Sequence, residues 1–205
     1  MADDVLSALP ARRGHFLLES GLHTDLWLTL DALFLSPAKL APLITALANR
    51  LRPFGASAVC GPLLGGAFLA QALATELGVH FYYSEPHLPS VASGLFAAAY
   101  HIPQELRKRL RGEKVALVDD VISAGSSVRA TAEALTAAGA SILVVGSFLA
   151  LGTGAIDHFG GLGIPFEALE RRQFSTWGPA ECPLCKAGVA LEDPLKHKGA
   201  ATPYS

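Results

Sequence analysis

Cysteine is scarce in this chain, and charge is low overall. The 205 residues include three cysteines, and charged residues make up 17% of the total. An odd and low number of cysteines argues against a disulfide scaffold and fits a reducing compartment. The formal net charge is -2, so the chain lacks the basic footprint of a nucleic-acid-binding protein.

Long apolar runs are absent as well. No uninterrupted apolar run reaches the roughly 18 residues that a membrane span needs. The stretch MADDVLSALPARRGHF has two acidic residues near its start and no long apolar h-region, which argues against a secretory signal. We therefore expect a cytoplasmic protein with no membrane partner. Hydrophobic residues make up 51%, which excludes disorder for most of the chain and allows one sizeable core.

Strand-like and helix-like segments alternate along the middle of the chain. Ser36 and Pro37 begin a helix predicted to end at Leu51, and further helices are expected at 67–77 and 126–138. Short apolar strands precede or follow each of them. This alternation predicts an α/β fold with a parallel sheet covered on both faces. Residues 84–103 have no clear period and predict a long loop that could include a hairpin.

The segment Val115–Ala130, VALVDDVISAGSSVRA, carries the main chemical signal. Asp119 and Asp120 end a predicted strand, and small and hydroxyl residues lead into a helix. Bare backbone N–H groups at a helix N-terminus bind phosphate, and carboxylates accept hydrogen bonds from a vicinal diol. Together they predict a ribose 5-phosphate site. Solvated loop acids, or the metal-binding acids of a receiver-like domain, are the alternatives. The loop has no Lys, which excludes GxxxxGK[ST] chemistry.

A second glycine-rich turn follows an earlier predicted strand. The segment CGPLLGGAFLA, 60–70, repeats the order of strand, bare loop and helix. Taken alone, it is also what an ordinary tight turn between a strand and a helix looks like. Beside the first motif, we interpret it as a second phosphate-binding loop.

The first motif resembles the phosphoribosyl diphosphate (PRPP) binding motif of type I phosphoribosyltransferases. That resemblance implies a parallel-sheet, Rossmann-like α/β core with a small N-terminal hood and a C-terminal tail. We place the hood at 1–36, the core at 37–173 and the tail at 174–205. Asp119 and Asp120 would hold the ribose hydroxyls, and Mg²⁺ would bridge pyrophosphate and ribose oxygens. The 5-phosphate loop would comprise Ser123, Ala124, Gly125, Ser126 and Ser127. The pyrophosphate loop would comprise Gly61, Pro62, Leu63, Leu64, Gly65 and Gly66.

The N-terminal segment GHFLLESGLHTDLWLTL is similar to the start of orotate phosphoribosyltransferases. The positions that match the base-binding hood of that family are Phe16, Ser20, Gly21 and Thr24. The chain departs from the family at Glu19, where a Lys is common. In FYYSEPH, which stands where the family has a basic run before its catalytic loop, only Glu85 matches.

Cations are missing where this chemistry needs them. No Lys or Arg occurs from Pro53 to Leu106. Negative charge builds on the departing pyrophosphate, and positioned cations stabilise it. His87 or His101 could serve with Mg²⁺, or the run RKRLRGEK at 107–114 could supply the charge. The run could equally be a solvated surface stretch, and either histidine an ordinary surface residue. We take Asp119, Asp120 and His87 as the catalytic candidates.

These observations predict an enzyme that transfers the 5-phosphoribosyl group from PRPP to a nitrogenous base with Mg²⁺. The favoured acceptor is orotate, in pyrimidine nucleotide synthesis. One alternative is another base, a purine or uracil. The other is a non-catalytic regulator that binds PRPP or a nucleotide. The small-molecule partners are PRPP and the base, no nucleic-acid partner is expected, and the family implies a homodimer.

The tail contains a Cys-x-x-Cys knuckle, Cys182 and Cys185 in ECPLCKAG. Such a knuckle supplies half of a zinc site, and a closed site needs four ligands. His158 and His197 are possible further ligands without convincing spacing, and two chains could share one Zn²⁺ across a dimer axis. Two reduced thiols of minor structural role are the alternative. A redox pair is disfavoured because the motif does not open a helix after a strand.

Overall fold

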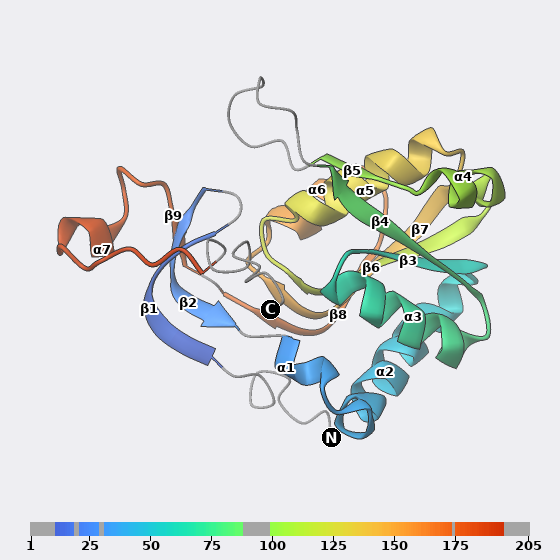
Figure 1. Ribbon diagram of the computed structural model, residues 1–205, viewed down its shortest axis with the longest axis horizontal. Helices are drawn as coiled ribbons and strands as arrows, with labels where there is room; N and C mark the ends of the chain where they lie inside the picture. Colours follow the sequence, from blue (N-terminus) through green and yellow to red (C-terminus); the bar gives the residue numbers. More distant parts are fainter. Residues whose placement is uncertain (1–10, 19–20, 29–30, 88–98, 174, 195–205) are drawn as a thin grey trace, which may run out of the picture.

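The computed structural model describes residues 11–18, 21–28, 31–87, 99–173 and 175–194. The chain forms two sheets, one of six strands and one of three (Figure 1). None of the helices in the described ranges is both long and apolar enough to cross a membrane.

The six-stranded sheet has the order β5-β4-β3-β6-β7-β8. Its strands run parallel except β5, which pairs antiparallel with β4. The strands are β3 (Ala58–Pro62), β4 (His80–His87), β5 (Ala99–His101), β6 (Lys114–Ile122), β7 (Ser141–Leu151) and β8 (Phe166–Arg172). The helices between them are α3 (Gly65–Leu77), α4 (Gln104–Leu110), α5 (Ser126–Ala137) and α6 (Gly154–Gly161).

Strand β6 shows how the sheet divides the core. Ala116 and Val118 pack on one face against α3 and against α2 (Pro37–Leu51). Val115 and Leu117 pack on the other face against α4, α5 and α6. Successive side chains on a strand point to opposite faces, so a strand buried on both sides reads as a continuous apolar run. This arrangement confirms the predicted α/β fold with a mostly parallel sheet.

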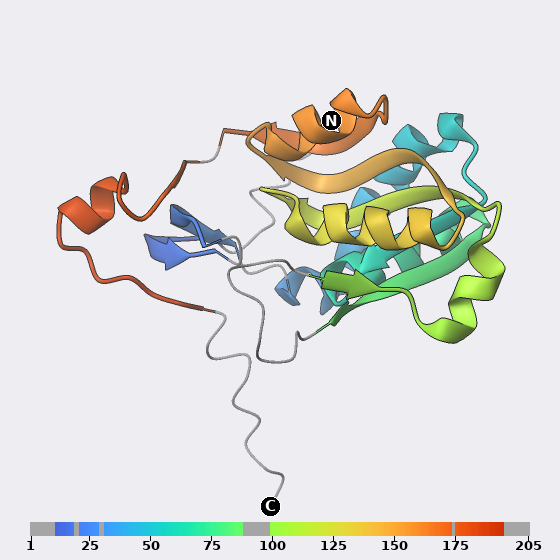
Figure 2. The ribbon, with the colours of Figure 1, turned by 90° about the horizontal axis from the view of Figure 1, so that it is seen from above.

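The three-stranded sheet joins the two ends of the described chain. Strand β2 (His23–Leu28) pairs antiparallel with β1 (Ala11–Leu17) and with β9 (Thr176–Trp177). Figures 1 and 2 both show this sheet, with α7 (Pro183–Lys186), beside the six-stranded sheet and away from α4. We call β1, β2 and β9 the hood sheet. The short α1 (Asp31–Phe34) and the 3₁₀ turn η2 (Arg52–Phe54) flank α2.

Two of the predicted elements differ in extent from expectation. Strand β4 runs on to His87 and pairs with β5, so the long segment expected at 84–103 does include the base of a hairpin. Strand β6 does not end at the acid pair but continues to Ile122. The division into hood, core and tail at residues 36 and 173 remains a prediction.

Candidate active site

The six-stranded sheet opens between two strands at its carboxyl edge. Strand β3 pairs with β6 only as far as Cys60 and Leu117. Beyond that point β6 pairs with β7 as far as Ile122, while Gly61 and Pro62 of β3 pair with β4. Asp119 and Asp120 follow directly after the parting. A topological opening at the carboxyl ends of parallel strands is where open α/β sheets bind their ligands.

The two acids are nearly buried and point to different neighbours. The Asp119 side chain is 8% exposed, and its Oδ2 accepts a hydrogen bond of 2.9 Å from the Ser127 hydroxyl of α5. Its Oδ1 accepts a bond of 3.1 Å from the Asp120 backbone N–H. Asp120 is 9% exposed and accepts a bond of 2.9 Å from the Val121 backbone N–H. Successive side chains leave opposite faces of a strand, so the two carboxylates meet different neighbours at the opening.

The electrostatics of this pair favour a positive or proton-donating ligand. Burial raises the pKa of Asp119 well above its ordinary value, and the negative charge of Asp120 raises it further. The hydrogen bond from Ser127 opposes the rise. Hydroxyl donors or a cation placed between the acids would offset the cost of keeping both ionised.

The glycine-rich loop lies directly against the acids. A Cβ on Gly66 would stand 2.7 Å from Asp119 Oδ1 and 2.6 Å from the Cδ of Pro62. A Cβ on Gly65 would collide with the Asp120 carboxylate. Within this loop the Leu63–Leu64 peptide is cis, and the Leu63 N–H donates to the Ser84 carbonyl over 2.9 Å. Only backbone fits between the loop and the acid pair.

The loop after β6 leads into the N-terminus of α5. Gly125 adopts a left-handed φ of 79°, and a Cβ there would also stand 2.8 Å from the Cβ of Ala155. Gly125 is therefore the residue that this turn requires. Ser123, Ala124, Ser126 and Ser127 are partly exposed around it. The Ser127 hydroxyl links this turn to the Asp119 carboxylate.

Comparisons with known proteins decide the family. The model of the phosphoribosyl transferase domain matches residues 35–155, which is more than half of the chain. The chain belongs to the phosphoribosyltransferase family. The match spans β3, β6 and both loops at the opening. It confirms the resemblance drawn from the Val115–Ala130 motif and the expected class of enzyme.

Curated relatives match almost the whole phosphoribosyltransferase chain. The orotate phosphoribosyltransferase of Caldanaerobacter subterraneus subsp. tengcongensis is 32% identical over 189 residues, covering 91% of this chain and 90% of the relative. The orotate phosphoribosyltransferase of Thermotoga maritima is 33% identical over 184 residues, covering 88% and 89%.

Solved structures support the fold. The Aeropyrum pernix orotate phosphoribosyltransferase has a TM-score of 0.62 at 21% identity, covering 78% of this chain and 87% of its own. An adenine phosphoribosyltransferase has a TM-score of 0.63 at 22% identity, covering 82% and 98%.

The predicted hood residues lie in or between β1 and β2 of this phosphoribosyltransferase. Phe16 and Thr24 face each other across the two strands, and both are buried. Gly21 takes a left-handed φ of 76° in the turn between the strands. Ser20 and Glu19 lie outside the described residues. Phe16 and Thr24 therefore hold the hood together, and their contact with a base remains a prediction.

The residues expected to supply positive charge at the acid pair lie in three different parts of the structure. His87 ends β4 opposite Ala99, but its side chain is outside the described part of the structure, so its catalytic role remains a prediction. His101 Nε2 lies 3.2 Å from the Glu85 carboxylate on the paired strand. The run 107–114 covers the end of α4 and reaches Lys114, where β6 begins. Lys114 is about 16 Å from the acids along a strand, so the geometry argues against this run as their source of charge within one chain.

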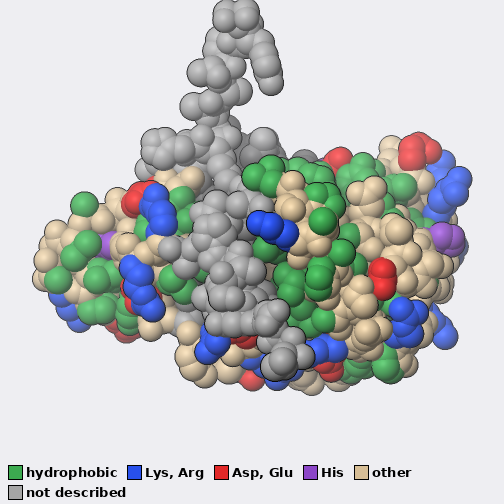
Figure 3. Space-filling model, turned by 90° about the horizontal axis from the view of Figure 1, so that it is seen from below, with side chains coloured by type: hydrophobic (Ala, Val, Ile, Leu, Met, Phe, Trp, Pro, Cys, Tyr) green, Lys and Arg blue, Asp and Glu red, His purple; other side chains and the backbone are tan. Residues whose placement is uncertain are grey.

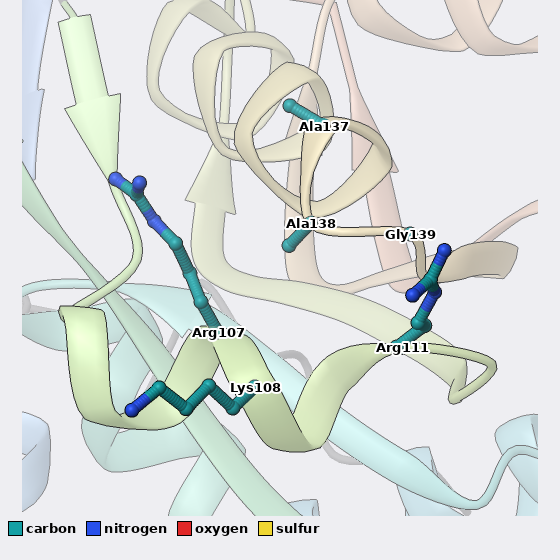
Figure 4. Close-up of a pocket in the computed structure, with 6 residues that line it drawn as sticks. All are labelled: Arg107, Lys108, Arg111, Ala137, Ala138 and Gly139. Carbon is teal, nitrogen blue, oxygen red and sulfur yellow. The ribbon is translucent and has the colours of Figure 1, made fainter.

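The basic run instead lines a separate pocket of about 420 Å³ (Figure 4). Arg107, Lys108 and Arg111 line it together with residues 137–139 at the end of α5. The acids lie at the opposite end of α5, a helix of 12 residues or about 18 Å. This pocket does not belong to the opening between β3 and β6.

The structure also gathers a group of residues that the sequence did not connect. His15 of β1 and His23 of β2 meet Cys182 and Cys185 of the tail. Burial, and next the neighbouring His15, lower the pKa of His23, which favours its neutral, metal-binding form. His158, suggested from the sequence as a further ligand, is exposed on α6 and is not part of this group. His197, the other suggestion, lies outside the described residues. The signal available in the sequence was a pair of histidines on either side of the turn between β1 and β2.

Proposed function

We propose that this enzyme transfers the 5-phosphoribosyl group of PRPP to orotate, releasing pyrophosphate and orotidine 5′-phosphate in pyrimidine nucleotide synthesis. The observation that carries the proposal is the approach of Gly65 and Gly66 to Asp119 and Asp120 at the opening of the sheet. A bare loop and two carboxylates suit a sugar that carries a phosphate on one side and a pyrophosphate on the other. The names of the curated relatives support orotate as the acceptor.

Each end of PRPP has a counterpart among the described residues. The ribose hydroxyls would donate to the carboxylates of Asp119 and Asp120. The 5-phosphate would accept hydrogen bonds from residues 123–127 at the start of α5, where the helix adds partial positive charge. The pyrophosphate would lie on the backbone of residues 61–66. These roles are proposals. The hydrogen bond of Asp119 with Ser127 and the close approach of Gly65 and Gly66 to the acids support them.

Mg²⁺ fits the donors at this site. It prefers oxygen ligands and keeps several waters, so it needs few protein groups. The two carboxylates, nearly buried and repelling each other, are suitable oxygen donors. When bound, Mg²⁺ supplies the positive charge that stabilises the departing pyrophosphate.

The residues of the protein act mainly by positioning the ribose, its phosphates and the base. No protein nucleophile is required, because the base nitrogen attacks C1 of the ribose directly. The acids orient the ribose, the two loops hold its phosphates in place, and the hood covers the base from β1 and β2. We propose His87 as the residue that brings a further proton or positive charge to the leaving group from the end of β4.

We also propose a homodimer, which an apolar patch beside the pyrophosphate loop supports. Leu35, Leu64 and Phe68 are 84%, 62% and 50% exposed. The Phe68 ring packs against the Phe34 ring with a centroid distance of 5.6 Å and a tilt of 49°, and Phe34 precedes Leu35 in the chain. Hydrophobic side chains gather on the face on which α1–α3 lie (Figure 3). Exposed apolar patches of this kind mark interaction surfaces.

The decisive experiment measures pyrophosphate release from PRPP and Mg²⁺ with a panel of bases: orotate, uracil, adenine, hypoxanthine, guanine and xanthine. Release with orotate alone is the expected result. Release with a purine alone would refute the acceptor, and the similarity to an adenine phosphoribosyltransferase is the reason to include purines. No release with any base, alongside calorimetric binding of PRPP, would instead identify a non-catalytic regulator.

Two variants complete the experiment. Asp119→Asn with Asp120→Asn should abolish PRPP binding. Asp157→Asn, an exposed carboxylate on α6, is the matched control and should bind PRPP as the unaltered protein does.

A further inference from the structure

The four residues at the junction of hood and tail form a compact group. Their ligand atoms all lie within 4.8 Å of one another. His15 Nε2 is 3.0 Å from His23 Nδ1, 3.4 Å from Cys182 Sγ and 3.7 Å from Cys185 Sγ. Cys185 Sγ is 3.3 Å from His23 Nδ1. His15, His23 and Cys182 are buried, while Cys185 is exposed at the outer side.

These distances are close to those of a tetrahedral zinc site. With Zn–N near 2.05 Å and Zn–S near 2.3 Å, neighbouring nitrogens stand about 3.3 Å apart, and nitrogen and sulfur about 3.6 Å apart. The observed nitrogen–nitrogen separation is 3.0 Å, and the nitrogen–sulfur separations run from 3.3 to 3.7 Å. A central ion could bind all four atoms with only small movements of the side chains.

The hydrogen bonding of His15 favours a central ion over a network of hydrogen bonds. His15 Nδ1 lies 2.8 Å from the Val189 carbonyl, which can only accept, so Nδ1 carries the proton. In the neutral ring, Nε2 then offers a single lone pair, and three polar atoms surround it. One lone pair does not satisfy three neighbours, whereas it can bind a metal. A backbone carbonyl on the far ring nitrogen is also the usual way in which a ligating histidine is oriented.

The hood and tail have little else to hold them together. Among residues 11–18, 21–28 and 175–194, five side chains are buried, and three of these belong to the group. The other two are Phe16 and Thr24. A module with so small a core needs a staple such as a metal or a disulfide. The two-residue strand β9, the backbone bonds between Glu192 and residues 15 and 17, and the exposed ion pair of Arg12 with Glu192 are further ties.

We propose that His15, His23, Cys182 and Cys185 bind one structural Zn²⁺ ion that fastens the tail to the hood sheet within a single chain. Two thiolates and two imidazoles in tetrahedral order select zinc among the common divalent metals. The protein fills all four positions, so the ion has no open position for substrate and its role is structural. The site does not depend on the identity of the base, nor on catalysis at the opening between β3 and β6.

Metal content of the untagged full chain, purified without chelator, tests the proposal. Elemental analysis should find one zinc per chain after desalting. Co²⁺ added to the demetallated, reduced protein should produce the visible absorption of a tetrahedral thiolate site. Cys185→Ser and His23→Ala should each lose stoichiometric zinc and that absorption. Cys60→Ala and His158→Ala, which remove a thiol and an imidazole elsewhere, should retain both.

Hydrogen exchange distinguishes a structural ion from a loosely held one. Removal of the metal should speed exchange in residues 11–28 and 175–193 while leaving β6 and β7 protected. The Cys185→Ser variant, altered at the exposed ligand, should show the same pattern and still fold in its core. The proposal would be overturned if the reduced protein bound neither zinc nor Co²⁺. A Cys182–Cys185 disulfide in freshly purified protein, or zinc retained by Cys185→Ser, would overturn it too.

Discussion

Asp119→Asn should make this protein more stable and at the same time weaken its binding of PRPP. The asparagine can keep both local contacts. Its oxygen accepts from the Asp120 backbone N–H, and its amide donates to the Ser127 hydroxyl that now donates to Asp119. What is lost is a nearly buried negative charge beside that of Asp120.

The sign of the stability change follows from the direction of the pKa shift. The folded-state pKa of Asp119 is raised by burial and then by Asp120, so the folded chain binds this proton more tightly than the unfolded chain does. The contribution of this group to stability is therefore favourable at low pH and is lost as pH rises through the folded-state pKa. Above the unfolded-state pKa, Asp119 therefore destabilises the fold. Each 1 kcal/mol of relieved cost should raise Tm by about 2–4 °C in a chain of this length.

The cost in binding can also be worked out. A hydrogen bond to a charged acceptor contributes about 1.5–3 kcal/mol. Its loss should weaken PRPP binding by roughly 10- to 150-fold. Thermal melts at about pH 8 and pH 5 and calorimetry with PRPP and Mg²⁺ are the assays. The Tm advantage of the variant should shrink at the lower pH, because the penalty on Asp119 falls as pH approaches its unfolded-state pKa.

Asp157→Asn serves as the control for binding, since that carboxylate is exposed and its loss should leave the PRPP affinity unchanged. A Tm that falls at both pH values would refute the electrostatic reasoning. A raised Tm with unchanged PRPP affinity would refute the binding role of Asp119 while leaving the electrostatics intact.

Three further results are expected. Gly66→Ala should lower kcat/KM by about 100-fold, because its Cβ would displace the Asp119 carboxylate. Gly160→Ala, which has open space around it, should leave kcat/KM unchanged. Equal losses in the two variants would contradict the crowding argument. Leu35→Glu should convert a dimer to a monomer, as measured by light scattering. Leu162 at the end of α6 is also exposed, at 62%, and Leu162→Glu should leave the dimer intact. A monomeric unaltered protein would refute the dimer. Removal of the proposed Zn²⁺ should raise KM for the base more than KM for PRPP in steady-state kinetics. An equal rise in both would contradict an action through the hood.

Local signals in the sequence predicted the elements whose determinants lie within a few residues. Ser36 and Pro37 marked the start of α2, and the helix runs from Pro37 to Leu51 as predicted. The acid pair and the small residues after it form one contiguous motif. Its chemistry could therefore be inferred, and the structure brings it against the glycine loop that the second motif predicted.

The features that escaped prediction depend on pairing between distant segments. The parting of β3 from β6 after Cys60 and Leu117 is a property of two strands in register, and no local pattern encodes it. Continued pairing with β7 likewise carries β6 past the acids to Ile122. His15 and Cys182 are 167 positions apart, and a chain read in one dimension gives no reason to join them.

The hood sheet has a consequence for the order in which the protein is made. Its central strand β2 is flanked by β1 from the start of the described chain and by β9 from near its end. A ribosome adding about 5–20 residues per second reaches Thr176 some 7–30 s after it has passed Leu28. During that interval β1 and β2 have neither their third strand nor the two cysteines, while the elements of the six-stranded sheet emerge in turn. The hood sheet is thus the last part of the described fold that can be completed, after the six-stranded sheet beside it.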